Sequence, residues 1–102
     1  MAGRVFVPSN DRRTHNYDTA KELGEVVVLP DIHNPFDLAR IQTQLRNTFG
    51  PITPEDTIIL SGKYQVVLCL FMNALEDMNM AHVAIYDAKS SGYVRRQMGW
   101  AG

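Results

Sequence analysis

The sequence has little cysteine, almost no net charge and no long apolar run. Its one cysteine, Cys69, cannot form a disulfide within the chain, which indicates a reducing compartment. Lysine and arginine number 10 against 11 aspartate and glutamate, for a net charge of −1. Nucleic-acid binders usually carry a basic excess, so this balance argues against nucleic acid as a partner. The longest nearly apolar run, residues 66–72, is much shorter than the roughly 20 residues of a membrane span.

The remaining composition is that of an ordinary globular domain. The chain has 102 residues, of which 45% are hydrophobic and 21% charged, so we expect one folded domain over residues 1–102. The first residues, Met1 to Val5, lack the apolar segment of a secretory signal. We therefore expect a soluble, cytoplasmic protein without a membrane partner.

Short apolar segments alternate with segments of helical periodicity. Strands are predicted at residues 4–8, 25–30, 57–60, 82–87 and 93–98, and helices at residues 17–23, 35–49 and 63–78. Asn34-Pro35 is expected to open the second helix and Gly50-Pro51 to end it. The unbroken apolar character of residues 25–30 suggests burial on both faces.

This order predicts an α/β fold. Strands alternating with helices imply right-handed crossovers, so we expect a small three-layer Rossmann-like domain with a mostly parallel sheet of about five strands. The last two strands would form a C-terminal antiparallel hairpin at the edge. The helix over residues 63–78 is apolar nearly all round, which predicts a homo-oligomer, most simply a two-fold dimer formed through this helix or the hairpin. The alternative is that the neighbouring helix covers the excess within one subunit.

Polar residues gather where two predicted strands end. Ligands bind beyond the carboxyl ends of the strands in open parallel sheets. Guanidinium groups suit phosphate or carboxylate, and a helix N-terminus preceded by glycine attracts anions. The candidate ligand-binding residues are Ser9, Asn10, Arg12, Arg13, Thr14, His15, Tyr17, Ser61, Gly62, Lys63 and Tyr64. The alternatives are a solvated loop with Asn16 as a helix cap, and a tight turn capped by Ser61; the second segment is not a Walker A loop.

Catalytic patterns are weak. Cys69 lies among aliphatic residues and is interpreted as a core residue. His15, His33 and His82 are scattered without metal-ligand spacing, so neither a metal nor a cofactor is predicted. Asp31 and His33 could form an acid–base pair or be plain loop residues. We expect a protein that is not an enzyme; the alternative is a nucleotide-processing hydrolase that uses Asp11, Asp31 or His15.

Several segments resemble a family of small phage and prophage proteins. They are Val7-Pro8-Ser9-Asn10, Thr14-His15-Asn16, residues 24–27, 45–49 and 56–62, and residues 83–87 followed by Tyr93-Val94. In such proteins a strand ending in a glycine-containing turn precedes an apolar helix, and a terminal hairpin carries an aspartate before a tyrosine. Gly62-Lys63-Tyr64 departs from the expected Gly-Asp-Pro-like turn and exchanges an acidic turn for a basic one. The resemblance implies a phage accessory protein in the bacterial host cytoplasm.

Together these patterns favour a function in binding. We expect the chain to bind and sequester an anionic small molecule, most plausibly a nucleotide-derived host immune signal of the cyclic nucleotide or ADP-ribose type, as an anti-defence protein. Tyr17 and Tyr64 would stack on the base. The alternative is an interaction module that docks on a host protein through the hairpin and Trp100, because aromatic residues and arginine are favoured at interfaces.

Overall fold

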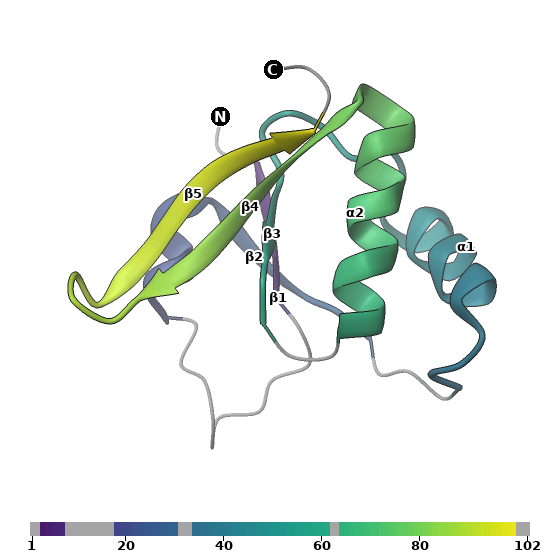
Figure 1. The fold of residues 1–102 in the computed structure, drawn as a ribbon, viewed down its shortest axis with the longest axis horizontal. Coiled ribbons are helices and arrows are strands. Elements are labelled where there is room, and N and C mark those ends of the chain that lie inside the picture. Colours follow the sequence, from purple (N-terminus) through teal and green to yellow (C-terminus); the bar gives the residue numbers. More distant parts are fainter. Residues whose placement is uncertain (1–2, 8–17, 31–33, 62–63, 100–102) are drawn as a thin grey trace.

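The computed structural model describes residues 3–7, 18–30, 34–61 and 64–99. Within them five strands form one mixed sheet, β2-β1-β3-β4-β5 (Figure 1). The strands are β1 (Arg4–Val7), β2 (Glu25–Val28), β3 (Thr57–Ile59), β4 (Met80–Asp87) and β5 (Gly92–Gly99). β1 pairs in parallel with β2 and with β3, and β3 pairs in parallel with β4. β4 and β5 pair antiparallel, which confirms the predicted hairpin.

Two α-helices, α1 (Leu38–Phe49) and α2 (Tyr64–Met78), occupy predicted helical segments. The prediction that Pro35 opens the first of them is wrong. Asn34 instead accepts a hydrogen bond from the Phe36 N–H at 3.1 Å and forms a separate turn, while Asp37 caps α1 by accepting from the Arg40 N–H at 3.2 Å. Neither helix has the length and apolar character that crossing a membrane requires, as far as the described residues go.

The predicted first helix is a 3-10 helix, η1 (Asp18–Leu23). Gly24 follows it at φ +152°, and a Cβ there would collide with the carbonyl oxygen of Gly3. The Glu25 N–H donates to that same oxygen at 2.9 Å, so the turn brings the start of β2 against the residue before β1. Glycine is needed here because it adopts this φ and leaves room for the second chain.

Alternate residues of the strands bury side chains on opposite faces of the sheet. Phe6, Ile58 and Val83 belong to a core that includes Ile41 and Leu45 of α1 and Val66, Leu70 and Ala74 of α2. Val5, Val7, Ile59 and Ala84 pack on the other face with Ala20 and Leu23 of η1. The two α-helices therefore cover one face, and the shorter η1 covers part of the other (Figure 1).

β2 is less buried than its sequence suggests. It lies at the edge of the sheet and pairs only with β1. Val26 and Val27 are half-buried, and Val28 is 51% exposed. The expectation that residues 25–30 are buried on both faces is therefore wrong, because an apolar run reports side-chain chemistry and not the position of its strand in the sheet.

Candidate functional site

The carboxyl ends of β1 and β3 lie side by side at the centre of the sheet. Val5 pairs with Thr57 and Phe6 with Ile58, in parallel, so both strands end at the same edge. The chain after β1 continues through η1 to β2, and the chain after β3 continues through α2 to β4 (Figure 1). These connections run in opposite directions along the sheet and over opposite faces. Such a divergence leaves space for a ligand between the strand ends.

Two of the sequence-predicted site residues lie within the described part of this edge. Ser61 is half-buried, and its N–H donates to the carbonyl of Ile59 at 3.0 Å. Tyr64 is the first residue of α2, and its side chain is 74% exposed. The first turn of α2 carries no acidic residue to neutralise the positive end of the helix dipole. The edge thus combines an exposed aromatic ring with a helix terminus that favours an anion.

The remaining candidates fall outside the described residues. These are Ser9, Asn10, Arg12, Arg13, Thr14, His15, Tyr17, Gly62 and Lys63. The same holds for Asp11, Asn16, Asp31, His33 and Trp100, which the alternative interpretations used. In the chain, residues 8–17 directly follow β1 and residues 62–63 directly precede α2.

Sequence reasoning missed Phe36. This residue lies in the connection from β2 to α1, and its side chain is 90% exposed. The N-terminal half of α1 lies near that of α2, because the Cys69 thiol donates to the carbonyl of Leu38 at 3.4 Å. Phe36 therefore belongs to the same edge of the domain as Tyr64. The available signal was an aromatic residue directly after Asn34-Pro35, in a short polar stretch that precedes the helix.

The described cysteine and histidine are poor catalytic groups. Cys69 is buried in α2, and burial raises the pKa of its thiol, so the interpretation of Cys69 as a core residue is confirmed. Burial lowers the pKa of His82, and the charge of Arg95 lowers it further, against a smaller opposite effect of Glu55. No group of three or more His, Cys, Asp or Glu side chains that could hold a metal occurs in the described part of the chain.

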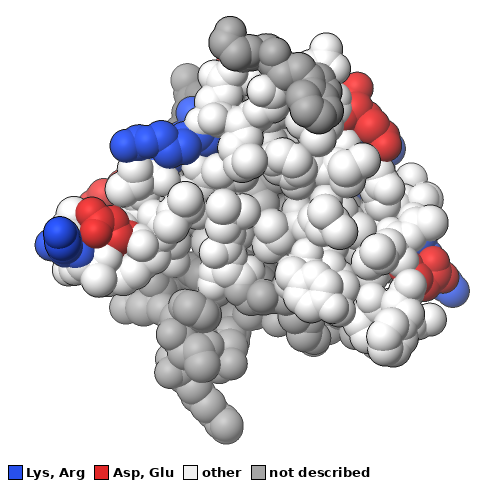
Figure 2. Space-filling model, viewed as in Figure 1, with Lys and Arg blue, Asp and Glu red and all other residues white. Residues whose placement is uncertain are grey.

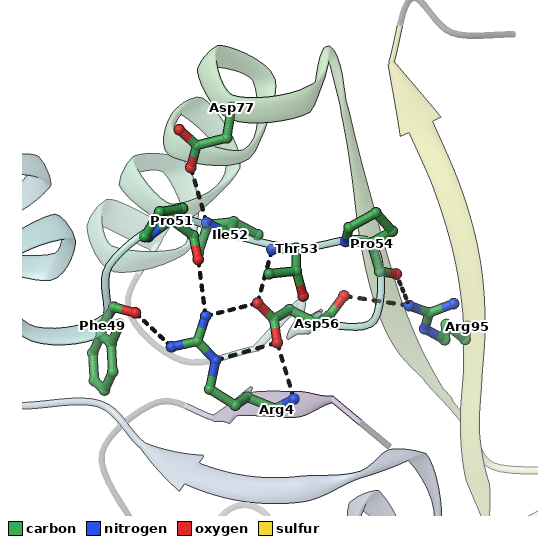
Figure 3. Close-up of polar contacts among 9 residues, drawn as sticks. All are labelled: Arg4, Phe49, Pro51, Ile52, Thr53, Pro54, Asp56, Asp77 and Arg95. Carbon is green, nitrogen blue, oxygen red and sulfur yellow. Dashed lines mark hydrogen bonds and ion pairs between the residues drawn. The ribbon is translucent and has the colours of Figure 1, made fainter. Parts of the chain in front are cut away.

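A second polar cluster lies at the opposite edge, where β1 and β3 begin (Figure 3). The Arg4 side chain donates to both carboxylate oxygens of Asp56, at 3.2 and 2.8 Å, and to the carbonyls of Phe49 and Pro51, at 2.6 and 3.0 Å. Asp56 is 2% exposed and also accepts from the N–H groups of Arg4 and Thr53. Burial by itself raises the pKa of Asp56, but these hydrogen bonds and the Arg4 charge outweigh it and hold the pKa below its usual value.

Arg95 of β5 forms hydrogen bonds with the connection between α1 and β3, which also contacts Arg4. The Arg95 guanidinium donates to the carbonyls of Pro54 and Asp56, at 2.8 and 3.3 Å (Figure 3). It also donates to the Thr57 hydroxyl at 2.7 Å. Each arginine thus donates at least three hydrogen bonds to residues 49–57, the end of α1, the α1–β3 connection and the start of β3. We interpret the cluster as a structural clamp, because both guanidinium groups use their Nε and Nη2 donors within the fold.

Comparison with known proteins adds no relative. No protein-family model, no curated protein and no solved structure matches this chain. The resemblance to small phage proteins therefore stays a prediction.

Proposed function

We propose that the chain binds an anionic small molecule at the carboxyl edge of the sheet, between the ends of β1 and β3. The observation that carries this proposal is the strand order β2-β1-β3-β4-β5, in which the connections after β1 and β3 diverge. Open sheets with parallel strands bind ligands at such a point. We also propose that the fold is a three-layer, Rossmann-like domain in which η1 forms a thin third layer.

The chemistry of the flanking segments favours phosphate. The segment after β1 contains Arg12, Arg13 and His15, and Lys63 directly precedes α2. Arginine forks bind phosphate oxygens in pairs, and the first turn of α2 leaves backbone N–H groups without helical partners. Because the whole chain has a net charge of only −1, these basic residues are concentrated in the two segments next to β1 and α2 in the sequence and not in the chain as a whole.

Exposed aromatic rings favour a nucleotide over a simple phosphate. Tyr64 and Phe36 are 74% and 90% exposed, and both lie at this edge. Aromatic side chains stack on nucleobases at a gain of about 1–3 kcal/mol per base. We propose binding without turnover, because the sequence offers no paired nucleophile and base, and Cys69 is buried. Sequestration of a nucleotide-derived host immune signal is the biological role that the phage resemblance adds to this proposal.

Isothermal titration calorimetry of the purified chain against linear nucleotides, cyclic nucleotides and ADP-ribose tests the proposal. We expect at least one of them to bind more tightly than about 100 µM, which corresponds to roughly −5.5 kcal/mol. Arg13→Ala and Lys63→Ala should each weaken that binding by about 1–3 kcal/mol, the range for losing a hydrogen bond to a charged group. Raising the salt concentration should weaken it further.

Lys21→Ala is the matched control. Lys21 is exposed in the last turn of η1, and the neighbouring Gly24 lies against Gly3 at the amino edge of the sheet. Its replacement removes one positive charge without touching the carboxyl edge, so affinity should stay the same. Absence of binding by every nucleotide tested refutes the proposal. Equal losses in Lys21→Ala and Lys63→Ala would show that only net charge matters and that the site is placed wrongly.

A further inference from the structure

One broad face of the domain has, among the residues that the structure describes, no charged side chains at its centre. Figure 2 shows this face along the shortest axis of the molecule, with lysine, arginine, aspartate and glutamate confined to its rim. In the same view α2, β4 and β5 lie towards the reader (Figure 1). The sequence explains the absence of charge, because residues 64–75 of α2 contain no charged residue.

The elements on this side of the domain, α2, β4 and β5, expose large apolar side chains. Leu68 and Met72 of α2 are 46% and 42% exposed, while Ile85 of β4 and Met98 of β5 are 52% and 49% exposed. Strand register places Ile85 and Met98 on the side of the sheet that α2 covers: Met98 is paired with Ala81, a core residue under the helices, and Ile85 lies two residues beyond Val83 of that core. Soluble monomers expose few contiguous apolar patches of this kind, and such patches usually mark interaction sites.

The neighbouring helix of the same subunit does not cover this surface. α1 packs on another side of α2, where Gln42 donates to Glu76 at 2.9 Å and Arg46 donates to Asp77 at 2.9 Å. The Asn73 carboxamide donates to the Gln42 carbonyl on that side as well. The alternative that the sequence left open, coverage of the apolar excess of α2 by α1, therefore fails for Leu68 and Met72.

We propose that a second copy of this chain covers the face, in a two-fold symmetric dimer. Strand register also places exposed Arg96 on this side, opposite Val83, so only the centre of the face is uncharged. An uncharged centre offers no counter-charge to a charged peptide or a nucleic acid, whereas the same centre in a second copy matches it in chemistry by symmetry. Size permits the same conclusion. The domain measures 36 × 34 × 22 Å, and the face lies across its two long dimensions. The outline of this face is therefore larger than the roughly 800 Å² that each partner buries in a stable interface.

Sedimentation velocity of the full chain over about 1–100 µM tests the dimer, since stable interfaces of this size commonly have dissociation constants in or below that range. We expect the wild type to sediment at twice the 11.5 kDa mass of one chain. Leu68→Glu/Met72→Glu should raise the dissociation constant at least about 100-fold, because it places charges at the centre of the interface. Both residues are exposed in the subunit, so circular dichroism and thermal unfolding at a concentration where both proteins are monomeric should match the wild type.

Thr43→Glu/Asn47→Glu is the control. It adds the same two charges at the same spacing on exposed positions of α1. This variant should remain a dimer. A monomeric wild type at every concentration overturns the proposal and leaves the face to another partner or to solvent. A dimer that survives Leu68→Glu/Met72→Glu, or one that both double variants break equally, overturns the placement of the interface. None of these outcomes depends on nucleotide binding.

Discussion

Replacing Arg4 by methionine should unfold the protein at a clearly lower temperature. Methionine keeps an unbranched apolar stem but removes the guanidinium, and with it two hydrogen bonds to the Asp56 carboxylate and one each to the carbonyls of Phe49 and Pro51. Asp56 would keep only the N–H groups of Arg4 and Thr53 as donors. Because Asp56 is 2% exposed, its charge would remain almost out of reach of water.

The expected loss follows from how much of this pair is buried. Removing one partner of a fully buried ion pair costs about 3–5 kcal/mol. The Arg4 side chain is 26% exposed, so water already weakens its half of the interaction, and we expect about 2–4 kcal/mol for this pair. In a domain of this length 1 kcal/mol shifts the melting temperature by roughly 4–8 °C. Arg4→Met should therefore melt at least about 8 °C below the wild type, on that same scale.

Thermal and urea unfolding, followed by circular dichroism, measure this difference. The control is Arg96→Met, which removes an exposed arginine of β5 whose side chain donates to the Arg95 carbonyl, and which should change stability by less than about 0.5 kcal/mol. In a double-mutant cycle, Arg4→Met and Asp56→Asn should together cost less than the sum of the two single changes. If Arg4→Met unfolds no earlier than Arg96→Met, the cluster does not stabilise the fold and the reasoning is refuted.

Other predictions concern acidity, backbone conformation and reactivity. Because folding lowers the pKa of Asp56, this carboxylate contributes fully to stability above its unfolded pKa of about 4, and the contribution is lost as pH falls through the folded pKa. Urea midpoints measured from pH 6 to pH 2 should therefore fall more steeply for the wild type than for Asp56→Asn. Parallel curves for the two proteins would contradict this. Gly24→Ala should lower the free energy of unfolding by at least about 1 kcal/mol, whereas Gly92→Ala, where a Cβ would meet only the Ser90 carbonyl oxygen at 4.0 Å, should change it little. The Cys69 thiol should react with a disulfide reagent only on unfolding, and rapid labelling of the native protein would show that its buried position is wrong.

The sequence alone determined the elements and their order. Local patterns carry this information: β-branched runs bounded by Gly, Pro or Ser predicted the strands, and the recurrence of Ile41, Leu45 and Phe49 predicted α1. The apolar stretch of α2 and the turn before Tyr93 were found for the same reason, since periodicity and turn residues act within a few positions. The start of α1 was misplaced because two caps, Asn34 and Asp37, compete within four residues, and only the folded chain shows which one holds the helix.

Tertiary structure decided everything that depends on distant partners. It placed β2 at an edge and β1 beside β3, because strand order follows from which faces the crossovers can cover and not from any single segment. It brought Arg4 into contact with Asp56, 52 positions away in the sequence, and the residues next to either one do not predict this contact. It also left Phe36 and Leu68 exposed although their chemistry suggests burial. The sequence predicted a ligand at the strand ends and a dimer through residues 63–78. Exposure depends on what packs against a side chain, so only the folded chain shows which apolar residues of these two surfaces are exposed.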